Sequence, residues 1–374
     1  MSTLFTPLKL GSLTIPNRIG MSALTRNRSS ANVPNEIMRQ YYAQRAAGGP
    51  GLIVSEGTLI TQQGSEWFNA PGIWNQAQVE GWKRITDVVH SNGSKIYCQI
   101  AHLGRCTHPD APEQIAAGVP VYAPSAIAAR GGKFRYIPGS PGYVTPTELP
   151  DPTIIIAQFK QAAVNAKEAG FDGIELHGAG GYMVHQFLDS SSNKRTDKWG
   201  GSVENRTRFA LEVLKALIEV FGPDVGLKIH PPAGQNDVGM PLQETIDTFG
   251  YLCREVNKLG IAYVALLRYR EAADAEIDGK KRGTPHDVIE TYSPFLPDTN
   301  IFVNGGVEPA EAEELVRAGK ASGVFFGVPW ISNPDLGKRI RAGKALINPI
   351  DSKTFYNPGV DLSLGYTDYK AAEY

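Results

Sequence analysis

The sequence predicts an α/β fold, a (β/α)8 TIM barrel with a parallel eight-stranded core. Eight short apolar segments along the 374 residues have the character of buried strands, and most are followed by a segment in which apolar residues recur at helical spacing. The connections between the strands are too long for hairpins, so the strands are expected to run parallel. In such a barrel the active site lies at the carboxyl ends of the strands.

The elements follow in chain order. The expected strands are 18–23, 51–55, 95–100, 171–177, 225–229, 261–266, 300–303 and 322–326. The expected helices are 35–47, 76–91, 153–169, one that begins after Ser202, 242–259, 308–319 and one around 334–342. Residues 4–15 could form an N-terminal hairpin, and the charged residues 269–285 are expected to form a loop. The Gly- and Pro-rich residues 103–150 are expected to be a long, mostly irregular active-site excursion after the third strand.

Local patterns support individual elements. Residues 51–55 (GLIVS) are a continuous apolar run, as expected of a strand that is buried on both faces. In residues 76–91 the apolar side chains recur at helical spacing. Ser202 is a suitable N-cap, and Glu204 suits the positive end of the helix that follows.

Length and composition indicate a globular protein. At about 150 residues per domain the chain would have two domains, but α/β barrels commonly run this long as one. We therefore expect a single barrel domain over 1–374 that contains the excursion 103–150. Hydrophobic residues make up 42% and charged residues 20%, which is ordinary for a soluble protein with a large core. The net charge of −1 gives no reason to expect nucleic acid or a membrane as partner.

The expected cellular location follows from three features: membrane spans, secretion signals and cysteine spacing. No apolar run approaches the roughly 18 residues of a membrane span, and the N-terminal residues lack the pattern of a secretion signal. The three cysteines, Cys98, Cys106 and Cys253, form no CxxC and no metal-ligand spacing. A reducing, cytoplasmic location is the expectation.

The central stretch for function is 171–182, FDGIELHGAGGY, a strand that ends in a glycine loop. His177 and Tyr182 both follow the strand closely enough to point into one pocket. A histidine can donate a hydrogen bond to a substrate oxygen, and a tyrosine, with an ordinary pKa of about 10, can hand over a proton. Such a pair taken alone is more often a satisfied polar histidine and a packing tyrosine.

Further candidates stand at the other strand ends. They are Thr25, Gly57, Gln99, His102, Lys228, Gly305, Gly306 and Gly327. Loops after the seventh and eighth strands of such barrels often bind phosphate through backbone N–H groups, and glycines let the backbone approach an anion closely. Plain turn glycines remain the alternative interpretation.

Two other kinds of site are disfavoured. Gly178 and Gly180 follow a strand as in a dinucleotide-binding fold, but Met183 stands where the third glycine of that fingerprint belongs. A metal site lacks support because His177 and His185 have no partner at ligand spacing.

Dense matches along the chain resemble one enzyme family. The matching segments are PNRIGMSALTRNR at 16–28, SEGTLI at 55–60, NAPGIW at 69–74, QIAHLGR at 99–105, HGAGGYMVHQFLD at 177–189, NKRTDKWGGSVENRTRF at 193–209 and WISNPDL at 330–336. In these residues the chain resembles the Old Yellow Enzyme family of NADPH dehydrogenases and flavin-dependent ene-reductases, with fungal and plant members the most similar.

The resemblance implies an FMN held without a covalent bond at the strand ends. By motif position, Ala23, Leu24 and Thr25 would lie along the isoalloxazine, and Gly57 and Gln99 would contact its pyrimidine side.

The resemblance also implies the charged contacts of the FMN. Lys228 takes the place usually held by a cation near flavin N1, where positive charge favours the reduced cofactor. The phosphate end would meet Gly305, Gly306, Phe326 and Gly327.

The implied reaction is the reduction of an activated alkene. NADPH or NADH would reduce FMN, and an α,β-unsaturated aldehyde, ketone, imide or nitroalkene would then bind on the same flavin face. His177 would hold the substrate oxygen, hydride would pass from N5 to the β-carbon, and Tyr182 would protonate the α-carbon from the opposite side. Tyr356, in the segment FYNPG, would lean over the substrate.

Two positions depart from the family pattern. The family carries Asn or His three residues after the first histidine, so that two side chains hold the substrate oxygen, but here that position is Gly180. Losing one such donor typically costs roughly 10²–10³ in rate. Val328 stands where members usually carry an arginine that faces the phosphate, a charge-assisted contact of about 1.5–3 kcal/mol.

Three functions therefore remain open. The first is a broad ene-reductase of small enones, enals and nitroalkenes. The second is a pathway enzyme of the same fold, either an isomerase, a desaturase or a reductase of one bulky metabolite, which Gly180 favours. The third is a flavin-binding or scaffold protein without turnover. A monomer and a homodimer are both compatible with the sequence.

Overall fold

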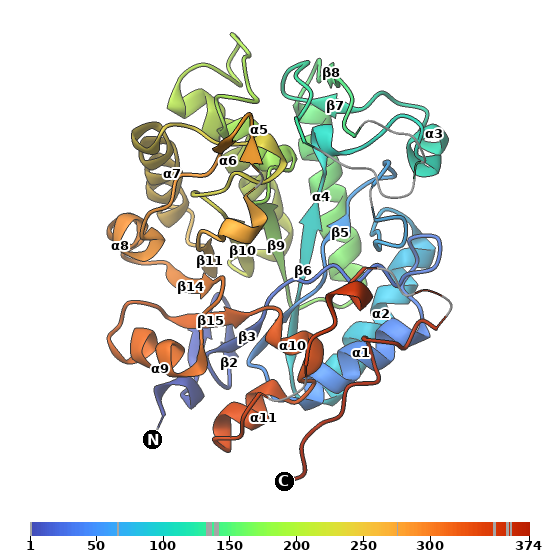
Figure 1. Ribbon diagram of the computed structural model, residues 1–374, viewed down its shortest axis with the longest axis vertical. Coiled ribbons are helices and arrows are strands. Elements are labelled where there is room, and N and C mark those ends of the chain that lie inside the picture. The colour runs from blue at the N-terminus through green and yellow to red at the C-terminus, as the bar shows by residue number, and fades with distance from the viewer. Residues whose placement is uncertain are drawn as a thin grey trace.

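The computed structural model is a closed barrel of eight parallel strands surrounded by helices (Figure 1), and it describes residues 2–65, 67–131, 137, 142–274, 276–346, 349–356, 359 and 361–374. The barrel strands are β3 (Ile19–Met21), β4 (Leu52–Val54), β6 (Lys95–Ala101), β9 (Gly173–Gly178), β10 (Val225–Ile229), β11 (Tyr263–Leu267), β14 (Asn300–Asn304) and β15 (Gly323–Phe326). Neighbours pair in parallel, and β4 pairs with β6, which closes the ring. The predicted fold class is confirmed.

The predicted helices are present with ends close to those expected. They are α1 (Glu36–Ala47), α2 (Gln76–Ser91), α4 (Thr153–Glu168), α6 (Val203–Phe221), α7 (Leu242–Asn257), α9 (Pro309–Arg317) and α11 (Leu336–Arg341). Ser202 caps α6 as predicted, because its hydroxyl accepts from the N–H of Asn205 at 3.3 Å. The N-terminal hairpin is also confirmed, as β1 (Leu8–Leu10) paired antiparallel with β2 (Leu13–Ile15).

Several short elements were not predicted. They are the helices α3 (Pro112–Ala117), α5 (Met183–Leu188), α8 (Val288–Tyr292) and α10 (Pro329–Ser332), the strands β5 (Thr58–Leu59), β7 (Tyr122–Ala123), β8 (Thr147–Glu148), β12 (Glu276–Ile277) and β13 (Lys280–Lys281), and the 3-10 turns η1 (Thr3–Phe5), η2 (Gly104–Cys106), η3 (Gln235–Asp237), η4 (Glu271–Ala273), η5 (Ser293–Phe295) and η6 (Ser352–Thr354). Every residue of α5 is buried, so it shows no amphipathic period by which a sequence pattern could reveal it.

The expectation of a plain loop over 269–285 is wrong in part. β12 and β13 form an antiparallel hairpin there, joined by Asp278 and Gly279, whose φ angles are 52° and 72°. Two positive φ angles in a two-residue connection match the twist of a hairpin, and Asp-Gly is a sequence favoured for it. The signal was therefore present in the sequence.

Aromatic rings pack across glycines in the barrel interior. In four pairs of adjacent strands, an aromatic residue of one strand lies directly opposite a glycine of the other in the parallel register. The pairs are Tyr97 with Gly173, Tyr263 with Gly226, Phe302 with Gly323, and Phe325 with Gly20. A Cβ on Gly20 would lie 2.3 Å from Cδ1 of Phe325, so the ring fills the space that a side chain would need. The barrel interior is a packed core rather than a channel.

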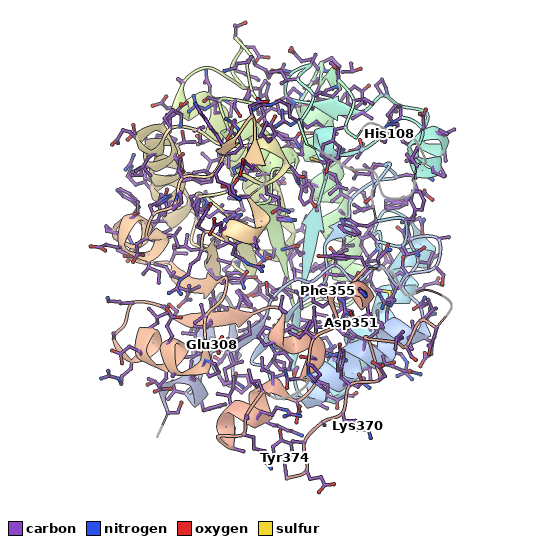
Figure 2. All side chains as sticks on the ribbon, in the orientation of Figure 1. His108, Glu308, Asp351, Phe355, Lys370 and Tyr374 are labelled. Atoms are coloured by element: carbon purple, nitrogen blue, oxygen red, sulfur yellow. The ribbon has the colours of Figure 1, made fainter. Side chains whose placement is uncertain are left out.

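Two buried arginines after β3 hold the C-terminal segment against the barrel. Arg28 Nη2 donates to the carbonyl of Thr354 at 2.9 Å and Arg26 Nη2 donates to that of Gly365 at 2.6 Å. Farther along, the segment lies beside α1 (Figure 1), where the Tyr41 and Tyr366 rings stack at 4.1 Å. Phe355, labelled in Figure 2, lies in this segment. These contacts bring residues 352–356 from the far end of the sequence to the site described below.

Within the described residues, no helix combines the length and apolar character that crossing a membrane requires.

We predict that Gly20→Ala lowers the free energy of unfolding by about 1–3 kcal/mol, because the new methyl group would overlap the ring of Phe325. Urea denaturation followed by circular dichroism measures the change. In a double-mutant cycle with Phe325→Leu, the smaller side chain should relieve much of the cost. An unchanged midpoint for Gly20→Ala would mean that the interior is not packed as described.

Candidate active site at the strand ends

Two adjoining cavities open at the carboxyl ends of the strands, with volumes of about 540 Å³ and 250 Å³. The residues that line both are Ala23, Leu24, Lys228, Leu267, Arg270 and Val328. Because so much of their lining is shared, one elongated ligand can occupy both spaces.

The structure brings the residues predicted from the sequence together in this region. The larger cavity is lined by Ala23, Leu24, Thr25, Gln99, His177, Gly180, Tyr182, Lys228 and Tyr356. The smaller cavity is lined by Ala23, Leu24, Lys228, Gly305, Gly306, Phe326 and Gly327. Gly57 lines a small space of about 30 Å³ that also touches Thr25, Gln99, His177 and Tyr182. Of the strand-end candidates, only His102 lines none of these spaces.

His177 and Tyr182 face the larger cavity side by side, with ring centroids 5.3 Å apart at 78°. Burial, and next the nearby charge of Lys228, lowers the pKa of His177 to about 3, so the ring is neutral at physiological pH. Its Nδ1 accepts a long hydrogen bond from the N–H of Ala179 at 3.4 Å. The proton of the neutral ring therefore belongs on Nε2, which can donate to a ligand.

A buried carboxylate, Glu175, lies two residues before His177 on the same face of β9. Gln99 Nε2 donates to Glu175 Oε1 at 2.6 Å, and the Tyr263 hydroxyl donates to Oε2 at 2.7 Å. These bonds fix the orientation of the Gln99 amide at the cavity. Sequence reasoning missed Glu175, although a carboxylate in the middle of an apolar strand is a signal that a buried partner exists.

Lys228 is the buried cation of the site. It lies opposite His177 in the parallel register of β9 and β10, and its Nζ donates to the Ser22 hydroxyl at 3.0 Å. Burial lowers the pKa of Lys228, and the charge of Glu175 opposes that change. Burial raises the pKa of Glu175, and Lys228 opposes that in turn. The two groups thus support each other's charged forms in a low-dielectric place.

The smaller cavity has the backbone of an anion site. Gly305 and Gly306 have φ angles of 106° and 72°, and a Cβ on Gly306 would meet nothing within 4 Å. Among the described residues, the N–H groups of Gly306 and Gly327 have no hydrogen-bond acceptor. Open N–H groups on glycine loops are a recurring way to hold an anion.

Two arginines follow β11 beside this cavity. Arg268 Nη1 is paired with Glu311 Oε1 at 2.7 Å. Arg270 lines both cavities, is exposed, and forms no ion pair with the described residues. Sequence reasoning found neither residue, because only the fold brings the loop after β11 next to Val328.

Residues from loops and from the short elements η3 and α10 also line the larger cavity, and the sequence did not single them out. They are Trp67, Gly131, Tyr143, Gln235, Asn236, Ile331 and Phe355. Trp67 packs on Tyr356 with ring centroids 4.0 Å apart, so the C-terminal segment and the loop after β5 form one wall.

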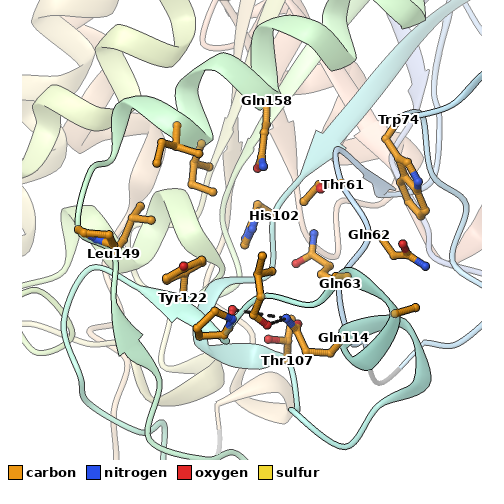
Figure 3. A pocket seen from close by; sticks show the side chains of 17 residues that line it. Thr61, Gln62, Gln63, Trp74, His102, Thr107, Gln114, Tyr122, Leu149 and Gln158 are labelled. Carbon is orange, nitrogen blue, oxygen red and sulfur yellow. Dashed lines mark hydrogen bonds between the residues drawn. The ribbon is translucent and has the colours of Figure 1, made fainter.

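Other histidines and cavities lie outside the site. His230 Nε2 donates to the carbonyl of Arg268 at 3.2 Å, and burial lowers the pKa of the His230 ring to about 3, so this histidine is neutral and has a packing role. His102 lies in a separate cavity of about 550 Å³ (Figure 3), where Gln63, Gln158 and His102 point inward. A groove of about 870 Å³ lies beside α8 and α9. Among the described residues, no cluster of His, Cys, Asp or Glu side chains could hold a metal ion.

Comparison with known proteins agrees with this geometry. Residues 3–346 match the NADH:flavin oxidoreductase / NADH oxidase family. The chain is 40% identical to chanoclavine-I aldehyde reductase fgaOx3 of Penicillium roqueforti over 99% of this chain and 96% of that protein. The solved structure of morphinone reductase superposes with a TM-score of 0.87 at 36% identity, covering 99% of this chain and 96% of that one. The old yellow enzyme from Trypanosoma cruzi superposes with a TM-score of 0.87 at 30% identity, covering 99% of both chains.

A parallel barrel with these strand-end residues, matched along almost its whole length, leaves one assignment: the chain belongs to the NADH:flavin oxidoreductase / NADH oxidase family, within its Old Yellow Enzyme group, and is an NAD(P)H-dependent flavin oxidoreductase.

Proposed function

We propose that this enzyme is an FMN-dependent ene-reductase that reduces the alkene of an α,β-unsaturated carbonyl or nitro compound with NADPH or NADH as the hydride donor. The observation that carries the proposal is the pairing of a neutral hydrogen-bond donor, His177, with a proton donor, Tyr182, in the larger cavity. That cavity shares six lining residues with the glycine-lined one, so the two together offer adjoining spaces for a flavin and an acceptor.

The residues present fit FMN. The open N–H groups of Gly306 and Gly327 suit its phosphate, and Lys228 at the junction of the cavities suits the ring system. Arg270 supplies the positive charge at the phosphate that Val328 cannot supply. Thr25 and Gln99 offer polar groups on the wall of the larger cavity.

FMN bound in these cavities would supply the hydride-transfer chemistry from NAD(P)H to the β-carbon of the acceptor. His177 holds the oxygen of the acceptor through Nε2–H, and this bond strengthens as negative charge builds there. Tyr182 gives its hydroxyl proton to the α-carbon. Lys228, a buried cation, would stabilise negative charge on the ring system of the cofactor, because charges interact more strongly where water is excluded.

A second candidate is a reductase or isomerase of one bulky metabolite. Gly180 favours it, because it adds no side chain to the cavity wall. The relative at 40% identity is named a chanoclavine-I aldehyde reductase, and chanoclavine-I aldehyde is therefore an acceptor to test here.

The first experiment follows the visible spectrum of the protein with FMN under anaerobic conditions. NADPH should bleach the flavin absorbance, and 2-cyclohexenone should then restore it. Bleaching without return for any small enone, but with return for a bulky enal, would favour the second candidate. If neither NADPH nor NADH bleaches the flavin, both candidate functions are wrong, and the protein binds flavin without turnover.

Tyr182→Phe should slow return of the flavin absorbance by roughly 10²–10⁴ and leave bleaching by NADPH unchanged, because only the second half-reaction needs the proton. Stopped-flow absorbance measures both rates. Tyr122→Phe, in the separate cavity of Figure 3, is the matched control and should change neither. Equal slowing of both half-reactions by Tyr182→Phe would contradict its role as the acid.

Arg270→Met should raise the Kd of FMN roughly tenfold, and the difference from the parent should shrink as salt is added, because the side chain is exposed. Quenching of FMN fluorescence on titration with apoprotein measures the Kd. Arg268→Met is the control, since that guanidinium is already paired with Glu311. If Arg268→Met weakens FMN as much as Arg270→Met does, Arg270 is not the specific partner of the phosphate.

A further inference from the structure

A second loop fills the space beside Gly180. Gly180 follows β9 with a φ of 67°, and a Cβ on it would lie 3.5 Å from Cε2 of Tyr182 and 3.7 Å from Oε1 of Gln235. These are ordinary contact distances. The amide of Gln235, which comes from η3 after β10, therefore lies next to the place that a Cβ at position 180 would take.

We propose that Gln235 supplies the second hydrogen bond to the substrate oxygen, alongside His177. The inference rests on the proposed ene-reduction and deepens it by naming the group that completes the oxygen-binding site. The donor comes from the loop after β10 instead of from the loop after β9.

The Gln235 amide has the right chemistry and is available. It lines the larger cavity together with His177 and Tyr182. A glutamine amide carries two N–H donors, and its terminal torsion is roughly two-fold, so Nε2 can take the place of Oε1. Within the described part of the chain, neither side-chain atom of Gln235 has a hydrogen-bond partner, and no carboxylate lines this cavity to compete for its donors.

The neighbouring Asn236 has a different task. Its Nδ2 donates to the carbonyl of Gly180 at 2.7 Å, and its Oδ1 accepts from the Tyr143 hydroxyl at 3.1 Å. Both ends of its amide are therefore engaged. This bond joins the loop after β10 to the loop after β9 and sets Gln235 against Gly180.

The backbone of the loop is held in a conformation that costs energy. Asn236 and Asp237 have φ angles of 57° and 58°, a backbone conformation that residues other than glycine rarely adopt. Asp237 is paired with Arg130 at 2.9 Å and with Arg282 at 3.1 Å. Arg105 donates to the carbonyl of Asp237 at 3.0 Å. A strained segment that is held by several ion pairs and hydrogen bonds is typical of functional sites.

Gly181 explains how the loop comes so close. A Cβ on Gly181 would lie 2.5 Å from the carbonyl oxygen of Gln235 and 2.8 Å from Cβ of Asn236, and its φ is 73°. Any side chain there would push the loop away. The two glycines therefore differ in role. The lack of a side chain at Gly181 lets the loop after β10 approach closely, and the lack of one at Gly180 leaves room for the Gln235 amide.

The test uses an oxyanion as a stand-in for the developing charge. 4-Nitrophenolate is titrated into the oxidised, FMN-loaded enzyme, and its Kd is measured from the absorbance change. Gln235→Ala should raise that Kd about tenfold or more, and Gln235→Glu, which keeps the shape but has no donor when ionised, should raise it at least as much. Gln243→Ala, on the surface of α7, is the control and should leave the Kd unchanged.

Stopped-flow rates add a second readout. Gln235→Ala should slow reoxidation of the flavin by 2-cyclohexenone about 10²-fold while bleaching by NADPH is unchanged. Gly180→Asn should restore both the rate and the Kd in the Gln235→Ala background, because asparagine tolerates this left-handed φ and the space is open.

The outcomes separate this inference from the proposed function. If Gln235→Ala and Gln235→Glu leave both the Kd and the reoxidation rate at the parent's values, the Gln235 inference is overturned while the ene-reductase assignment stands. If the parent enzyme itself fails to reoxidise with any enone or enal, the proposed function fails. The nitrophenolate Kd values of the same variants still support or overturn Gln235 as the donor in that case.

Discussion

The packing of aromatic rings across glycines inside the barrel is the constraint on which the site depends. Each of four rings lies opposite a glycine of the next strand, and no side chain could replace those glycines without displacing the ring that packs there. Interiors packed at crystal-like density transmit such shifts rather than absorb them. Tyr263 belongs to this layer, and its hydroxyl also donates to Glu175, which orients Gln99 at the cavity. The core that closes the barrel thus directly positions polar groups at the place where a flavin and its acceptor would meet.

Electrostatics at the strand ends follow from the same burial. Burial keeps His177 neutral, so it donates a hydrogen bond without adding a positive charge, whereas the charges of Lys228 and Glu175 oppose the effect of burial on each other's pKa. The exposed Arg270, which also lines both cavities, adds a positive charge that water screens. The site thus combines a buried cation, a screened cation and a neutral donor that faces the larger cavity.

How far the sequence could predict this arrangement depends on what kind of information each residue carries. The barrel and its strand-end residues were predictable, because the apolar runs mark the strands and parallel topology brings their carboxyl ends to one place. Thr25, Gln99, His177 and Lys228 came together for that reason alone. The helix α5 was not predicted because it is buried on all sides and so has no amphipathic pattern. The hairpin β12–β13 was not predicted either, although the Asp278-Gly279 sequence is typical of its turn. Gln235 and Arg270 could not be found from the sequence, since their importance lies in which other loop they approach.

Gly180 shows why a missing side chain should be judged by what occupies its place. From the sequence alone it counted as a lost donor, at a cost of roughly 10²–10³ in rate. In the structure, the space next to Gly180 is bounded by the Gln235 amide, on a loop tied back to the carbonyl of Gly180 itself. A donor that reaches over from another strand end restores the chemistry without restoring the residue. It also shifts the anchor to a longer, more adaptable side chain, so the same change that keeps the oxygen-binding site can alter which acceptors fit beside it.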